Sequence, residues 1–208
     1  GLAVSVELPL IIVNSQRAGP STGLPTRAEQ SDLMQAIYGR HGEAPLVVLA
    51  PKSPSDCFEI AHQAVKIAIK YMTPVMILSD AYLTNASEPW LIPNIEKIDK
   101  FPIKFAEYEE NFQPFERNKE TLARKWVRPG TKGMEHRIGG LEKDSISGNI
   151  SYDPENHSMM TDLRSKKIQI IEKEFSDIAI EGSSKNGDIL VIGWGSTNGP
   201  ISEVKELL

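Results

Sequence analysis

Three short, continuous apolar runs constrain the fold of this 208-residue chain more than any other feature. They cover residues 8–13, 45–50 and 74–79, and stretches with helical periodicity separate them. Runs that are apolar throughout, instead of alternating with polar residues, indicate strands that are covered on both faces. Strands that alternate with helices are typical of βαβ units. We therefore predict an α/β fold in which these three strands lie at the centre of a parallel sheet.

Two helices between the runs carry recognisable start signals. In the first, Thr26 is a candidate N-cap, and Glu29, three residues on, completes a capping box. In the second, Ser53 precedes Pro54, and proline is favoured in the first turn of a helix. The apolar positions at helical spacing are Leu33, Ala36 and Ile37 in the first helix, and Phe58, Ala61, Val65, Ala68 and Met72 in the second. Each helix is therefore predicted to cover the sheet with one apolar face.

The texture of the sequence divides the chain into four units. Residues 1–88 hold the βαβ pattern. Residues 89–157 are rich in proline and charge but also in aromatic residues, so we predict a connecting region packed on the surface. Residues 158–186 are predicted to form an amphipathic helix, ending near Ile178, and a linker. Residues 187–208 start a new βα pattern with an apolar strand first.

Charge and cysteine content exclude several classes of function. The formal net charge is -5 and basic residues are scattered among acidic ones, which disfavours nucleic acid as a partner. The longest apolar runs are far shorter than the roughly 20 residues of a membrane span. Cys57 is the single cysteine, so the chain cannot ligate an iron–sulfur cluster by itself, and a reducing cytoplasm fits best. The four histidines show no metal-ligand spacing, and we predict no metal site in this chain.

The segment between the first run and the first helix carries the candidate chemistry. In open α/β sheets ligands bind at this edge. Gly19 and Gly23 allow close approach of the backbone to a ligand, and a helix that begins after Thr26 offers free N–H groups to an anion. The Arg17 guanidinium matches a carboxylate with two parallel hydrogen bonds, and Ser21, Thr22 and Thr26 supply hydroxyls. The alternative is a surface arginine beside an ordinary glycine turn.

Residues 17–26 resemble the Arg-X-Gly-Pro-Ser-Thr-Gly-X-Pro-Thr signature of the α subunits of 2-oxoacid:ferredoxin oxidoreductases. Further stretches that resemble the family are 29–33, 39–43, 51–57, 79–82 and 135–142, so the resemblance covers most of the chain. The features at 39–43 and 136–142 look most like the 2-oxoglutarate type. Pyruvate and branched-chain 2-oxoacids remain alternative substrates.

The resemblance implies an enzyme that decarboxylates a 2-oxoacid on thiamine diphosphate, passes the electrons to ferredoxin and releases an acyl-CoA, with CoA as co-substrate. It implies a pyrimidine-type thiamine-diphosphate domain at 1–88, incomplete at its N-terminus, and the start of a transketolase C-terminal-like domain at 187–208. A β subunit is expected to hold the cofactor's diphosphate with Mg²⁺, and an iron–sulfur cluster is expected in a partner subunit. The protein is thus expected to be a hetero-oligomer.

Carried over residue by residue, the resemblance makes Arg17 the ligand of the 2-oxoacid carboxylate and Thr26 a substrate-side residue. Ser21 and Thr22 are expected to shape the pocket, with Gly19 and Gly23 near the cofactor. His136 is a candidate for the distal end of the substrate, although most isolated histidines are simply exposed or hydrogen-bonded. The family often has glycine at the position of Ala18. Alanine is acceptable there only if φ is below zero.

The family's Tyr-Pro-Ile-Thr-Pro stretch and the glutamate that activates the cofactor's aminopyrimidine do not occur in this sequence. We expect both upstream of Gly1 in a longer subunit, and we expect the chain alone to be inactive. An exposed sheet edge would then invite dimerisation of the isolated chain.

Two other functions fit parts of the same pattern. One is a non-catalytic α/β binding module whose glycine loop holds an anionic ligand. The other is a stand-alone transketolase-like enzyme, which requires a diphosphate and magnesium motif that the sequence does not show. Dependence on a partner subunit distinguishes the oxidoreductase from both.

Overall fold

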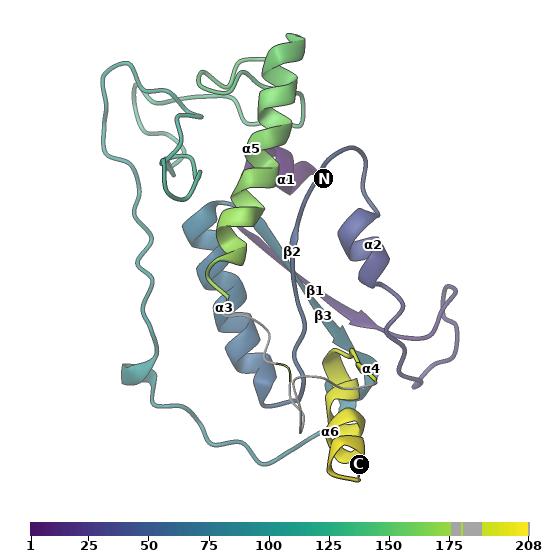
Figure 1. The fold of residues 1–208 in the computed structure, drawn as a ribbon. Coiled ribbons are helices and arrows are strands. Elements are labelled where there is room, and N and C mark those ends of the chain that lie inside the picture. Colours follow the sequence, from purple (N-terminus) through teal and green to yellow (C-terminus); the bar gives the residue numbers. More distant parts are fainter. Residues whose placement is uncertain (176–179, 181–188, 208) are drawn as a thin grey trace.

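A parallel three-stranded sheet forms the centre of the fold. The computed structural model of the chain describes residues 1–175, 180 and 189–207. Strands β1 (Leu10–Gln16), β3 (Pro74–Asp80) and β2 (Val47–Leu49) lie side by side in that order, and both neighbouring pairs are parallel (Figure 1). The prediction of an α/β fold with a parallel sheet is confirmed.

Strand β1 starts later and is more exposed than the sequence predicts. The first residues form a short helix, α1 (Leu2–Val6), which ends at Glu7 in the left-handed conformation (φ 51°), so the strand begins at Leu10. Leu10 and Val13 are 45% and 64% exposed, although we expected all three strands to be central and covered. In the part of the chain that the structure describes, β1 and β2 each pair with β3 alone, so β3 is the central strand.

Helix α3 (Asp56–Tyr71) covers one face of the sheet. It begins later than the predicted Ser53, with Ser55 at its N-cap. Its buried face is rotated from the predicted one, because Ala61 is exposed whereas Ala64 is fully buried. Of the predicted positions, Ala68 and Met72 are buried as expected, and the small side chain of Ala64 allows close packing in the core. The core on this face comprises Val47, Leu49, Ala64, Ile67, Ala68, Tyr71, Val75, Ile77 and Ile171.

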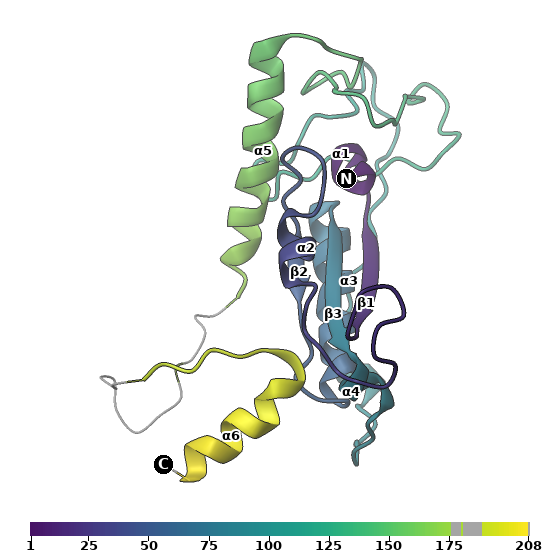
Figure 2. The same cartoon turned by 90° about the vertical axis from the view of Figure 1, so that its right-hand side faces the viewer.

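The long helix α5 (Pro154–Glu172) runs past the sheet and contributes Ile171 to the same core (Figure 2). It begins before the predicted residue 158 because Asp153 caps it. The Asp153 carboxylate accepts a hydrogen bond from the Asn156 N–H (2.7 Å), and Pro154 occupies the first turn. Ile178, where the sequence predicts the helix to end, lies outside the described residues.

An irregular segment joins α4 (Ala81–Asn85) to α5. A 3₁₀ helix, η1 (Ile95–Lys97), interrupts an exposed arm in which Leu91 is 92% exposed. Residues 112–151, here called the loop lobe, are held by turns and bridges around the fully buried side chain of Phe115. The division of the chain into four units stays a prediction.

The C-terminal part returns to the sheet edge. A 3₁₀ turn, η2 (Gly195–Thr197), leads into α6 (Asn198–Leu207), and η2 lies near α4 at the end of β3 (Figure 1). The strand predicted at the start of 187–208 is wrong for its described residues: 189–192 are irregular and exposed. A strand needs a hydrogen-bonding neighbour, and none of the described strands pairs with this run. Among the described residues, no helix is both long enough and apolar enough to cross a membrane.

Candidate functional site

The glycine loop (residues 17–26) leaves the sheet at the carboxyl end of β1. Its two arms are tied at the base, because Ala18 N–H donates to the Arg27 carbonyl (3.4 Å) and Leu24 N–H donates to the Ala18 carbonyl (3.3 Å). Ala18 is buried at this base, and its φ is not positive, so the backbone there accepts alanine in place of glycine. Every candidate side chain of the loop is exposed: Arg17, Ser21, Thr22 and Thr26. The loop therefore presents its polar groups outward from a closed base.

Arg17 keeps its guanidinium within the loop. Its Nη1 donates a hydrogen bond to the Thr22 carbonyl, which leaves the other guanidinium N–H groups free of protein partners among the described residues. No acidic side chain of the described chain forms an ion pair with it. An exposed guanidinium without a counter-ion is available to an incoming carboxylate.

The two glycines of the loop have different structural roles. Gly23 has φ +54°, and a Cβ there would overlap the Ala18 carbonyl oxygen that closes the loop. Gly19 has no atom within 4 Å of its would-be Cβ and is not left-handed. The fold therefore requires glycine at 23, whereas nothing in the described chain requires it at 19.

This difference makes a paired prediction. Gly23→Ala is expected to destabilise the protein by about 1 kcal/mol or more, because it combines a left-handed φ with a backbone clash. Gly19→Ala is expected to leave stability within about 0.5 kcal/mol, as for surface substitutions, and to weaken ligand use. Thermal unfolding and steady-state kinetics of both variants measure the two effects. If Gly19→Ala has the same steady-state kinetics as the wild type, a ligand does not approach closely at this glycine.

The predicted N-cap role of Thr26 is wrong. Helix α2 (Leu33–Tyr38) begins seven residues later with Asp32 before it, and Thr26 itself is left-handed (φ 65°). Glu29, the other half of the predicted capping box, accepts a hydrogen bond from Gly19 N–H instead (3.3 Å). The free N–H groups predicted after Thr26 are therefore not those of a helix.

The side-chain amides of Gln16 and Asn14 fix the return segment and delay the helix. Gln16, 1% exposed, donates through Nε2 to the Ser79 carbonyl (3.1 Å), and its Oε1 accepts from Asp32 N–H (3.0 Å). Asn14 Nδ2 also donates to the Asp32 carboxylate (2.9 Å). These bonds hold Asp32 against the ends of β1 and β3, so the chain turns into α2 only after it.

Asp80, at the end of β3, is the centre of a second network that the sequence did not reveal. Its Oδ1 accepts from the N–H groups of Tyr82 and Leu83 (3.0 Å each) and so caps α4. Its Oδ2 accepts from Gln30 Nε2 (3.3 Å) and from Ser196 N–H (3.1 Å). Burial alone would raise the pKa of Asp80, but these hydrogen bonds outweigh it and lower the pKa. Asp80 is therefore a buried acceptor that joins three segments.

Comparison with known proteins identifies the family. Residues 1–151 match the family model described as pyruvate flavodoxin/ferredoxin oxidoreductase, thiamine diphosphate-binding. The chain belongs to this family. The 2-oxoglutarate oxidoreductase subunit KorA of Mycobacterium tuberculosis is 53% identical over 203 residues, which are 98% of this chain and 31% of that protein. The 2-oxoglutarate synthase subunit KorA of Methanothermobacter thermautotrophicus is 33% identical over 196 residues, or 94% of this chain and 51% of that protein.

A solved structure agrees with this assignment. The 2-oxoglutarate:ferredoxin oxidoreductase from Magnetococcus marinus, with 2-oxoglutarate, coenzyme A and succinyl-CoA bound, superposes with a TM-score of 0.89 at 33% identity. The match covers 100% of this chain and 36% of that chain. The predicted family is thus confirmed, and the chain spans from 31% to 51% of the length of these relatives.

His136 lies away from the glycine loop. Its Nδ1 is 2.8 Å from the Met134 carbonyl and its ring packs on Phe112, within the loop lobe. The lobe attaches at Glu7, before β1, whereas the glycine loop follows β1. A seven-residue strand spans roughly 20 Å. No described contact joins His136 to the loop, so its substrate role remains a prediction.

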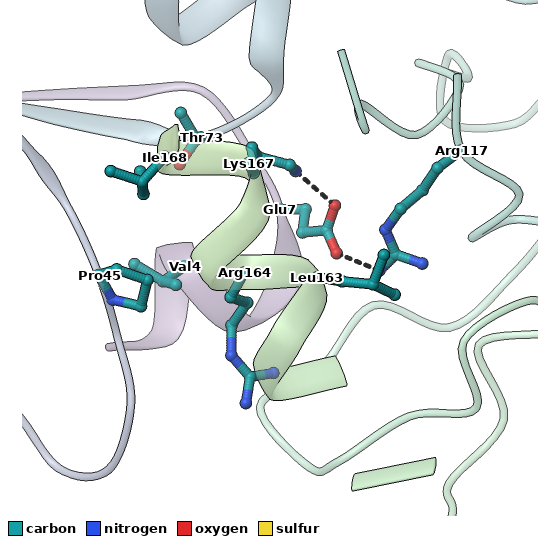
Figure 3. Close-up of a pocket in the computed structure, with 9 residues that line it drawn as sticks. All are labelled: Val4, Glu7, Pro45, Thr73, Arg117, Leu163, Arg164, Lys167 and Ile168. Carbon is teal, nitrogen blue, oxygen red and sulfur yellow. Dashed lines mark hydrogen bonds and ion pairs between the residues drawn. The ribbon is translucent and has the colours of Figure 1, made fainter. Parts of the chain in front are cut away.

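The opposite end of β1 holds a buried ion cluster. The Glu7 carboxylate lies between Arg117 and Lys167, whose Nζ is 2.8 Å from Glu7 Oε2, and all three side chains are at most 7% exposed (Figure 3). Arg124 donates through Nε to the Glu7 carbonyl (3.2 Å), while its buried Nη2 has no hydrogen-bond partner among the described residues. This cluster fastens the loop lobe and α5 to the start of β1.

The cavity beside this cluster is too small for a substrate. It has a volume of about 10 Å³ and is lined by Val4, Glu7, Pro45, Thr73, Arg117, Leu163, Arg164, Lys167 and Ile168 (Figure 3). That volume is near the lower limit for one water molecule. The cluster is therefore a structural clamp.

Proposed function

We propose that this chain is part of the α subunit of a 2-oxoacid:ferredoxin oxidoreductase that converts 2-oxoglutarate, CoA and oxidised ferredoxin to an acyl-CoA, CO₂ and reduced ferredoxin. The names of its relatives and the ligands of the Magnetococcus enzyme support 2-oxoglutarate over other 2-oxoacids. The observation that carries the proposal is the exposed Arg17 guanidinium, without an acidic partner among the described residues, on a loop at the ligand edge of the sheet.

Each loop residue has a part in this proposal. Arg17 exchanges its bond to the Thr22 carbonyl for the 2-oxoacid carboxylate, to which its planar fork donates two hydrogen bonds. The Thr26 hydroxyl faces the substrate, and Ser21 and Thr22 shape the pocket around it. Gly19, with open space where a side chain would be, lets the cofactor or substrate approach the backbone, and Gly23 allows the loop to close.

The residues of this chain fit the substrate side of thiamine diphosphate and not its diphosphate. The described residues contain no group of three or more His, Cys, Asp or Glu that would hold a metal ion. As the family resemblance implies, we place the diphosphate and Mg²⁺ in the β subunit and the aminopyrimidine side of the cofactor against this chain. When bound, the cofactor supplies the carbon nucleophile and electron sink for decarboxylation.

The proposal also fixes the kind of partners. The single cysteine of this chain cannot ligate an iron–sulfur cluster, so the cluster that passes electrons to ferredoxin lies outside this chain, and we place it in a partner subunit of a hetero-oligomer. We also propose a cytoplasmic location, because a chain with a single cysteine suits a reducing compartment.

The test is reduction of a viologen dye by the full-length α subunit co-purified with its β partner. We expect reduction that requires both a 2-oxoacid and CoA, fastest with 2-oxoglutarate, and slower with pyruvate or 2-oxoisovalerate. The α subunit without its partner serves as the control and is expected to be inactive. Absence of activity with all three acids would instead favour a non-catalytic binding module whose glycine loop holds an anion.

A further inference from the structure

We propose that the η2 turn and Gln30 form a latch that positions the glycine loop for substrate, so that the C-terminal segment of this chain controls 2-oxoacid binding. The inference rests on the proposed function, because it takes the glycine loop as the substrate loop. It assigns Gln30, Asp80 and Gly195 as positioning residues, none of which contacts the substrate.

One side-chain amide joins the two segments. Gln30 Nε2 donates to the Trp194 carbonyl (2.6 Å) and to Asp80 Oδ2 (3.3 Å), and Asp80 Oδ2 also accepts from Ser196 N–H. The η2 turn is itself closed by Thr197, whose Oγ1 donates to the Trp194 carbonyl (2.6 Å). The turn and the return segment of the loop, more than 160 residues apart in sequence, thus share one carboxylate at the end of β3.

Gly195 allows the backbone of the η2 turn to lie close to the Gln30 amide. It is buried and left-handed (φ +65°), and a Cβ there would overlap Gln30 Nε2 and lie 3.3 Å from Asp80 Oδ2. The backbone of the turn therefore rests directly on the amide. A side chain at this position would push Gln30 off both acceptors.

Gln30 is well placed to transmit this constraint to the loop. The preceding residues hold the loop's other arm, since the Arg27 carbonyl accepts from Ala18 N–H and the Glu29 carboxylate accepts from Gly19 N–H. Ala18 and Gly19 follow Arg17 directly. The latch therefore fixes the base from which Arg17 projects, whereas the exposed tip of the loop has no such bond to the described residues of the C-terminal segment.

The test substitutes Gly195→Ala in the full-length α subunit with its β partner, with Gly199→Ala as the matched control. Gly199 lies in the same segment with no atom within 4 Å of its would-be Cβ and is not left-handed. We expect Gly195→Ala to raise KM for 2-oxoglutarate by roughly 10-fold to 100-fold, because a small misplacement of a positioning group has effects of this size. KM for CoA is expected to be unchanged, and Gly199→Ala is expected to behave as wild type.

Two further measurements separate positioning from loss of fold. A variant that only misfolds in part would lower kcat and leave KM unchanged. Gln30→Ala is expected to raise KM as Gly195→Ala does, and the double variant is expected to be no worse than either single variant, because both act through one amide. Additive effects, or a fall in kcat alone, would overturn the latch.

Hydrogen exchange tests the latch without reference to activity. The amides of residues 18–29 are expected to exchange faster in Gly195→Ala than in wild type or in Gly199→Ala. Unchanged exchange would overturn the coupling itself. If exchange in Gly195→Ala is faster but KM is unchanged for every 2-oxoacid, the glycine loop does not bind substrate as proposed. The latch would then not control 2-oxoacid binding.

Discussion

Arg17→Ala is expected to lower kcat/KM for 2-oxoglutarate by at least about 100-fold, because two charge-assisted hydrogen bonds of about 1.5–3 kcal/mol each are lost. Arg17→Lys keeps the charge but not the planar fork, and we expect an intermediate loss. The guanidinium is exposed and bonds only to its own loop among the described residues, so stability should change by less than about 0.5 kcal/mol.

The matched control is Arg27→Ala. Arg27 is an exposed arginine at the other arm of the same loop, and its contribution to the loop base is a backbone carbonyl that alanine retains. Steady-state dye reduction by the assembled enzyme measures both variants. Equal losses in Arg17→Ala and Arg27→Ala would mean that overall positive charge, and not a carboxylate clamp at Arg17, assists binding.

Glu7→Ala is expected to lower the free energy of unfolding by about 3–5 kcal/mol, the usual consequence of removing one partner of a buried ion pair. The substitution leaves Arg117, Lys167 and Arg124 buried together without their carboxylate. Equilibrium unfolding of the assembled enzyme measures the change. Asp99→Ala is the control, because it removes an exposed pair with Lys66 (3.4 Å) and should cost less than about 1 kcal/mol. A loss of similar size in both would contradict the clamp.

The same carboxylate makes stability depend on pH. Burial by itself would raise the pKa of Glu7, but attraction to Lys167 and Arg117 outweighs burial and holds the pKa below its ordinary value. The folded state therefore binds fewer protons than the unfolded state in acid. The stabilisation is fully present above the ordinary pKa of about 4.3 and is lost as pH falls through the lower folded value.

Glu7→Gln isolates this effect from other carboxylates. Burial lowers the pKa of Lys167 even though the nearby Glu7 carboxylate acts to raise it. Lys167 therefore adds no stabilisation of this kind, and the pH prediction rests on the Glu7 carboxyl group alone. We expect the melting temperature of the wild type to fall more steeply than that of Glu7→Gln as pH decreases below about 4.3. Parallel curves would show that Glu7 does not titrate with folding.

Local patterns in the sequence were enough to predict the centre of the fold. The apolar run at 74–79 appears as β3, because a strand buried on both faces needs continuous apolar residues. The run at 189–192 has the same composition but is not a strand, since pairing depends on a neighbour that composition does not specify. Thr26 carries a capping pattern, yet the amides that hold Asp32 delay the helix to Leu33.

The candidate site divides in the same way. Arg17 and Gly23 could be proposed from the sequence because their segment lies between a strand and a helix and matches a family signature, and their ligand roles stay predictions. The hydrogen bonds of Gln30 and Asp80 and the clamp at Glu7 were missed, because they join residues that lie from 50 to 164 positions apart in the sequence. A charged residue such as Lys167 is usually a solvated position on a helix, and only the fold shows it buried.

The most direct measurement is an experimental structure of the assembled enzyme with 2-oxoglutarate bound. The account predicts a substrate carboxylate within hydrogen-bonding distance, about 2.7–2.9 Å, of the Arg17 guanidinium, which has released the Thr22 carbonyl. A substrate held elsewhere, with Arg17 still bonded to Thr22, would contradict it.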